Sequence, residues 1–144
     1  MRIEERVTIN VPRQRVWESI SDISKASTFM EGIRFWPVEG EPATGMRARY
    51  TIRTHVGSAE VGGVVEVIEW DPPHELAWTS ITGIQQRGRW ILHGLGKRTE
   101  VIFRLQYQAP GGIVAVLADR IGGRTVKRNV RASLGNLKRM LEVR

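Results

Sequence analysis

The chain has 144 residues, of which 41% are hydrophobic and 26% charged, values typical of one globular domain with a sizeable core. It contains no cysteine, which excludes a disulfide framework, a thiol nucleophile and a cysteine-ligated metal. The net charge is +7, and residues 119–144 alone carry +6, with eight cations against Asp119 and Glu142. We therefore expect a single domain over residues 1–144 whose basic character is confined to its last segment.

The chain has no apolar run long enough to span a bilayer, and its first six residues lack the apolar core of a secretory signal. These missing signals predict a cytoplasmic protein. No zinc-ligand or phosphate-loop motif is present, so neither a metal nor another cofactor is expected.

The first part of the chain predicts one strand followed by two short helices. Residues 3–11 alternate between apolar and polar side chains, as a half-buried strand does. Pro12 ends this strand and suits the first turn of a helix that reaches about Ile20. A second short helix is expected from Ile23 to Met30, and residues 33–38 return to extended structure.

Five further strands are expected, each separated from the next by turn-forming residues: 46–56, 59–70, 75–81, 84–93 and 99–107. The turn Asp71-Pro72-Pro73 is well defined because two prolines cannot pair in a strand ladder. Since all the connections are short, the strands should form one antiparallel sheet of six or seven members.

The last segment predicts a long helix between about residues 113 and 142. One apolar stripe recurs at helical spacing in its C-terminal half: Val126, Val130, Leu134, Leu137 and Leu141. The apolar stripe of its N-terminal half lies nearly opposite, and Gly122-Gly123 between the halves predicts a kink or break. One straight helix that is apolar on two sides is the alternative. Only this element is long enough to cover the sheet, which predicts an α+β fold with a curved sheet around the helix.

Several motifs resemble the START-like superfamily, also called SRPBCC, which includes lipid-transfer START domains and aromatic polyketide cyclases. Residues 7–22, VTINVPRQRVWESISD, are similar to the opening of these proteins, and residues 70–78, WDPPHELAW, to their Asp-Pro-Pro turn and the strand after it. Further segments match the polyketide cyclase/dehydrase subgroup in order: 88, 99–101, 107–112 and 137–142. The resemblance covers nearly the whole chain and implies the helix-grip fold, with a cavity between the sheet and the terminal helix.

The side chains expected to line that cavity lie on the inward faces of the strands and of the helix. They are Tyr50, Ile52, Thr54, Trp78, Trp90, Leu92, Phe103, Leu105, Leu117 and Ile121, with Leu76 and Val101 from the same sets. A wall of this kind suits a hydrophobic or aromatic small molecule. A filled core without a cavity is the alternative.

No catalytic residue is assigned, because the three histidines, His55, His74 and His93, read as surface residues. The resemblance implies that the cyclases use pocket hydroxyls and a basic residue. Tyr50 and Thr54 are the candidates for the hydroxyls in this chain. The nearby arginines read as outward: Arg47, Arg49 and Arg53.

Three functions remain open. The first is binding or carriage of a small hydrophobic or aromatic ligand, such as a lipid, a quinone or a polyketide-like molecule. The second is a polyketide cyclase or dehydratase acting on a poly-β-ketone. The third is an interaction protein that uses its basic C-terminal helix, for which we expect weak, salt-sensitive contact with anionic membrane surfaces and no sequence-specific nucleic-acid binding.

Overall fold

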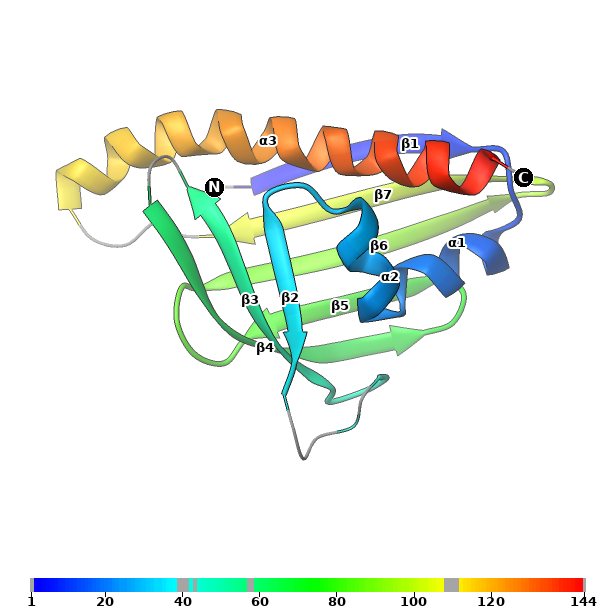
Figure 1. The fold of residues 1–144 in the computed structure, drawn as a ribbon, viewed down its shortest axis with the longest axis horizontal. Coiled ribbons are helices and arrows are strands. Elements are labelled where there is room, and N and C mark those ends of the chain that lie inside the picture. The colour runs from blue at the N-terminus through cyan, green and yellow to red at the C-terminus, as the bar shows by residue number, and fades with distance from the viewer. Residues whose placement is uncertain (1, 39–41, 43, 57–58, 108–111, 144) are drawn as a thin grey trace.

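The computed structural model describes residues 2–38, 42, 44–56, 59–107 and 112–143, without the side chains of residues 24, 54–56, 59–61 and 112–123. The elements run in the predicted order of one strand, two short helices, six strands and a long helix (Figure 1). The strands are β1 (Arg2–Ile9), β2 (Ile33–Pro37), β3 (Arg49–Val56), β4 (Ala59–Asp71), β5 (Glu75–Ser80), β6 (Gln86–Leu95) and β7 (Arg98–Tyr107). The helices are α1 (Arg13–Ile20), α2 (Ile23–Phe29) and α3 (Gly112–Glu142).

The strands form one antiparallel sheet in the order β1-β7-β6-β5-β4-β3-β2. All neighbours except β1 and β7 are consecutive in the sequence, as short connections require. β1 pairs with β7 along its whole length, from Arg2 opposite Gln106 to Ile9 opposite Thr99. The register of β4 shifts between Val67 and Glu69, and such a bulge increases the local twist that lets the sheet curve.

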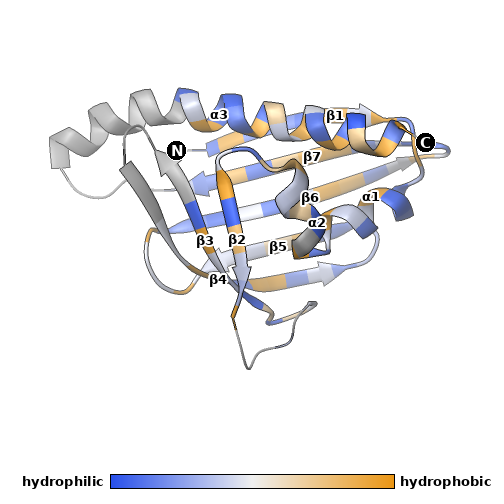
Figure 2. Ribbon diagram, viewed as in Figure 1, coloured by the Kyte–Doolittle hydropathy of each residue, from blue (hydrophilic) through white to orange (hydrophobic). Residues whose placement is uncertain are grey.

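The alternation of side chains assigns one face of the sheet to the core. Along β7, the inward residues from Thr99 to Tyr107 are at most 5% exposed. The predicted apolar stripe of α3 is buried against this face: Val126, Val130, Leu134, Leu137 and Leu141. Figure 2 shows the apolar side of the described half of α3 turned toward the sheet. The curved antiparallel sheet around a C-terminal helix, predicted as an α+β helix-grip fold, is confirmed.

α3 runs as one uninterrupted helix through Gly122-Gly123, so the predicted break there is wrong (Figure 1). Each glycine costs about 1 kcal/mol relative to alanine inside a helix. A break would instead create two new helix ends, each with up to about four backbone groups that need other partners. The continuous helix is therefore the cheaper arrangement.

Hydrogen bonds attach the C-terminal half of α3 to loops at the N-terminal end of the chain. Glu142 Oε2 accepts the backbone N–H of Asn10 at 2.8 Å, and Ser133 Oγ accepts that of Glu31 at 2.7 Å. Gly32 follows Glu31 with φ +72°, and a Cβ on it would lie 2.2 Å from Nδ2 of Asn129 on α3. Only glycine permits this close approach, which holds the segment after α2 against α3.

Candidate functional site

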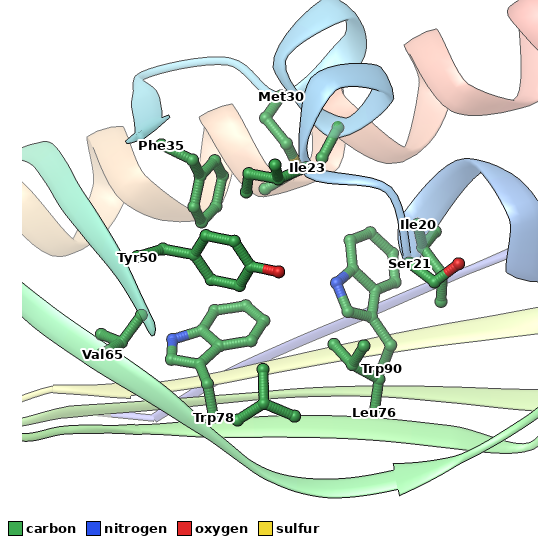
Figure 3. A pocket seen from close by; sticks show the side chains of 12 residues that line it. Ile20, Ser21, Ile23, Met30, Phe35, Tyr50, Val65, Leu76, Trp78 and Trp90 are labelled. Carbon is green, nitrogen blue, oxygen red and sulfur yellow. The ribbon is translucent and has the colours of Figure 1, made fainter. Parts of the chain in front are cut away.

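A pocket lies beneath α2, between the helical segment and the inner face of the sheet (Figure 3). Its free volume is about 40 Å³, which is room for a few water molecules. The side chains that line it are Ile20, Ser21, Ile23, Ala26, Met30, Phe35, Tyr50, Val65, Val67, Leu76, Trp78 and Trp90. The walls are therefore apolar and aromatic, apart from two hydroxyls and two indole N–H groups.

An aromatic cluster makes the pocket narrow. Trp78 packs edge-on against Phe35, with ring centroids 6.3 Å apart, and lies 5.8 Å from Phe103. Trp90 lies 4.5 Å from Phe103 and 6.1 Å from Phe29. These rings occupy most of the space above β5, β6 and β7, so the interior combines a filled core with a small pocket.

Four of the residues predicted to line a cavity are in this wall: Tyr50, Leu76, Trp78 and Trp90. Four others face inward but belong to the packed core and do not line this pocket: Ile52, Leu92, Phe103 and Leu105, each at most 3% exposed. Thr54, Leu117 and Ile121 are in the predicted elements, and their side chains lie outside the described residues. No residue of the described half of α3 lines the pocket, which lies instead against the α1–α2 segment.

Eight lining residues were not among the predicted set, and they come from the α1–α2 segment, β2 and β4. Val65 and Val67 alternate along β4 and are both buried on its inward face. Ile23, Ala26 and Met30 follow a helical spacing of three and four, which indicates one apolar face of α2. That spacing was the available signal, but it does not show which part of the sheet α2 covers.

The polar groups of the pocket are mainly donors. Burial, and to a smaller extent the charge of Asp22, raises the pKa of Tyr50 above 10.0, so the phenol stays protonated at neutral pH. Figure 3 shows the Tyr50 hydroxyl and the indole nitrogen of Trp90 directed toward one another across the pocket. Ser21 Oγ donates to the carbonyl of Trp17 at 2.6 Å and also forms part of the wall.

The indole N–H of Trp78 is buried without a hydrogen-bond partner in the described part of the chain. An indole nitrogen donates only, and a buried donor without an acceptor costs about 1–3 kcal/mol. Any acceptor that reached this atom would recover part of that cost. The wall therefore favours a ligand that combines an aromatic body with hydrogen-bond acceptors.

The burial of Tyr50 predicts that the free energy of unfolding depends measurably on pH in the alkaline range. Since the folded state holds the phenolic proton more tightly than the unfolded state, stability should decline as pH rises above about 10, until the phenol ionises in the folded state. Urea unfolding between neutral pH and the alkaline range would measure this decline. The Tyr50→Phe variant should show a shallower decline, and an identical slope in both proteins would contradict the assignment.

The surface residues considered for catalysis lie away from the pocket. His74 and His93 are exposed, and Nδ1 of His74 lies 2.9 Å from Nη1 of Arg13. The side chain of His55 lies outside the described residues. Arg47 and Arg53 are exposed and Arg49 bonds Glu66 at 3.2 Å. In the described ranges no group of three potential metal ligands comes together.

The basic helix presents five exposed cations in its described half: Arg124, Lys127, Arg128, Arg131 and Arg139. Arg131, which belongs to the same face, pairs with Glu5 of β1 at 2.8 Å and is partly neutralised. Contact of this face with an anionic membrane stays a prediction. Over the residues whose structure is described, no helix has the length and apolar character needed to cross a bilayer.

Comparisons with known proteins add to this geometry. The protein TTHA0849 from Thermus thermophilus is 21% identical, with a TM-score of 0.82 over 98% of this chain and 97% of the other. The Zhui aromatase/cyclase from a Streptomyces species is 18% identical, with a TM-score of 0.79 over 99% and 93%. A START superfamily protein from Mycobacterium smegmatis is 12% identical, with a TM-score of 0.73 over 96% and 98%. At these identities the solved structures show a shared fold.

Comparison with curated proteins finds no match to the sequence. The model of one protein family, described as polyketide cyclase / dehydrase and lipid transport, matches residues 1–142. The match spans nearly the whole chain and includes every helix and strand described above. The chain therefore belongs to the polyketide cyclase / dehydrase and lipid transport family.

Proposed function

We propose that this protein binds a small, flat, hydrophobic ligand in the pocket beneath α2. The observation that carries the proposal is the wall itself, which is aromatic and aliphatic with a few directed donors, a composition typical of small-molecule sites. Membership of a family described by both cyclase and lipid-transport activities supports a ligand of this class.

The donors define the chemistry of that ligand further. The N–H of Trp78, which has no partner among the described residues, requires an acceptor such as a ketone oxygen, and the protonated phenol of Tyr50 lies in the same wall. Tyr50 is the one ionisable side chain among the described residues that line the pocket, and its raised pKa keeps the phenol protonated, as a hydrogen-bond donor. Because the described residues of this wall offer hydrogen-bond donors but no carboxylate, histidine or lysine that could act as a base, binding or carriage ranks ahead of polyketide cyclisation or dehydration.

The pocket has to widen to admit such a molecule, since a drug-sized ligand occupies a site of about 300 Å³ or more. Two short elements form the outer wall and are the segments expected to move. α2 has seven residues, and β2 is an edge strand of five residues that pairs only with β3. Binding as proposed therefore requires α2 or β2 to move outward from the sheet.

An uncharged dye tests the proposal. Nile red should bind the native protein, and a flat aromatic ketone should displace it. Ala26→Leu adds bulk to the wall from α2 and should weaken dye binding by about tenfold or more. The reason is that the opened pocket would have to hold both the leucine side chain and the dye. Fluorescence titration measures the affinity, and native mass spectrometry of freshly purified protein would reveal a co-purified molecule.

The matched control is Ala132→Leu, the same substitution at an exposed position of α3. It should leave dye binding unchanged. If both variants bind Nile red as tightly as the unmodified protein, the dye is on the surface and the proposed pocket is not the binding site.

A further inference from the structure

A second hollow lies at the end of the sheet where β1 begins and β7 ends, on the left in Figure 1. It is a groove of about 580 Å³ lined by Arg2, Thr79, Ser80, Gln85, Gln86, Arg87, Gln106 and Tyr107. An adjoining hollow of about 230 Å³ on the outer face of the sheet shares three of these residues, Arg2, Arg87 and Gln106. No acidic residue lines either hollow, so both favour negative charge.

The strand register brings the shared residues into one row. Arg2 of β1 pairs with Gln106 of β7, and Gln106 pairs with Arg87 of β6. Residues directly opposite one another project from the same face of a sheet, here the outer face. With neighbouring strands about 4.8 Å apart, the two arginine backbones lie about 10 Å apart with Gln106 between them. Their long side chains can converge on one small ion above the glutamine.

The two arginines of this row have fewer acidic partners than the arginines beside it. Arg89 pairs with Glu69 and with Glu75, and Arg104 pairs with Glu4. Within the part of the chain that is described, the Arg87 side chain has no ion pair or hydrogen bond.

Arg2 has one weak acidic contact. It lies 3.7 Å from Glu4, which also bonds Arg104 and accepts from Arg6 at 3.0 Å. Bonds from Arg104 and then Arg6 lower the pKa of Glu4, which shows that its charge is already engaged. Among the arginines on this part of the outer face, the uncompensated positive charge is therefore centred on Arg2 and Arg87.

A buried donor adds an independent observation. Gln86 also lines the groove, its side chain is 5% exposed, and its Nε2 has no hydrogen-bond partner among the described residues. Its backbone N–H already donates to Ser80 Oγ at 3.1 Å, so the unsatisfied group is the side-chain amide. A buried amide of this kind is normally paired, and an oxygen acceptor in the groove would satisfy it.

We propose that this arginine groove, formed by Arg2, Gln86, Arg87 and Gln106, binds an oxyanion, either a phosphate or a carboxylate group of a small molecule. Guanidinium groups match the geometry of both anions with paired N–H donors. Gln106, between the two arginines, provides an amide donor on the outer face, and Gln86, one residue before Arg87 on β6, lines the groove from the inner face at the end of the sheet. The groove is separate from the pocket beneath α2 and shares no lining residue with it.

Amide NMR spectra, including the side-chain amide signals of glutamine, would test the groove during titration with sodium phosphate and, separately, sodium acetate. Sodium chloride keeps the ionic strength constant. We expect saturable shifts at Gln86, Arg87 and Gln106 in the millimolar range. Arg87→Gln should weaken the binding by about tenfold, since it removes a charge-assisted contact. Gln86→Met should weaken it to a smaller extent.

Arg98→Gln is the matched control, because Arg98 is exposed on β7 at the opposite end of the β6–β7 hairpin. It should retain the binding. Preference for phosphate or for acetate would identify which oxyanion the groove suits. Shifts that do not saturate, or that Arg87→Gln and Arg98→Gln reduce equally, would show general screening and overturn the proposal. Because Nile red is uncharged, failure here would leave the pocket proposal unaffected.

Discussion

Gly88→Ala is expected to destabilise the protein by about 2–3 kcal/mol and to abolish ligand binding beneath α2, as overpacking of a full core does. Gly88 of β6 lies directly opposite Trp78 of β5. A Cβ at position 88 would lie 2.0 Å from Cζ2, 2.3 Å from Cε2 and 2.4 Å from Cη2 of the Trp78 ring. The indole cannot retreat cheaply, because it is 5% exposed and packed against Phe35 and Phe103. The ring would have to move toward the pocket.

Urea unfolding and Nile red titration would measure the two effects. Gly94→Ala is the control on the same strand, since its Cβ would meet only the end of the Arg13 side chain, at 3.4 Å. It should change stability by no more than about 0.5 kcal/mol. In a double-mutant cycle, Trp78→Leu should relieve part of the cost of Gly88→Ala. Strictly additive effects would show that the clash with the indole is not the cause.

Phe103→Ala should destabilise the protein by about 3–5 kcal/mol, a large share of the 5–15 kcal/mol typical of a domain. Phe103 is 1% exposed and contacts both Trp78 and Trp90. Truncation removes these aromatic contacts and leaves a cavity next to both indole rings. Phe103→Leu should cost less, because it keeps most of the buried volume.

Leu95→Ala provides the comparison for that variant. Leu95 is half exposed at the end of β6, so its truncation should cost about 0.5 kcal/mol or less. Urea unfolding of Phe103→Ala, Phe103→Leu and Leu95→Ala would rank the three variants by their loss of stability. A Phe103→Ala protein as stable as Leu95→Ala would mean that the aromatic cluster contributes little to the core.

The sequence predicted the fold well because the relevant signals are local. The alternation from Thr99 to Tyr107 identifies the buried face of β7, and the Asp-Pro-Pro turn separates β4 from β5. Short connections then restrict the sheet to antiparallel neighbours. The break in α3 was predicted wrongly because the local cost of Gly122-Gly123 was weighed without the cost of two additional helix ends.

The position of the pocket could not be predicted from such signals. The alternation places Tyr50, Trp78 and Trp90 on the inward face, but it does not specify which rings meet one another. The Trp78 ring lies against Gly88 of the neighbouring strand, where the missing side chain leaves room for it. This contact joins two strands, so the alternation within either strand does not reveal it. The side of the sheet that α2 covers likewise depends on its packing, and this decides which inward residues line the pocket.

The pairing of β1 with β7 also concerns how the protein is made. On the ribosome, β1 emerges first, yet its partner strand ends at Tyr107, and Glu142 must emerge before it can accept the Asn10 N–H. Strands β2 to β7 can assemble in order as each hairpin is synthesised, since each strand from β3 to β7 pairs with the strand just before it. β1 has to wait with its edge groups unpaired, a state prone to association with other chains. Completion of the sheet is therefore a late, long-range event, and folding should be slow compared with that of a helical protein of the same length.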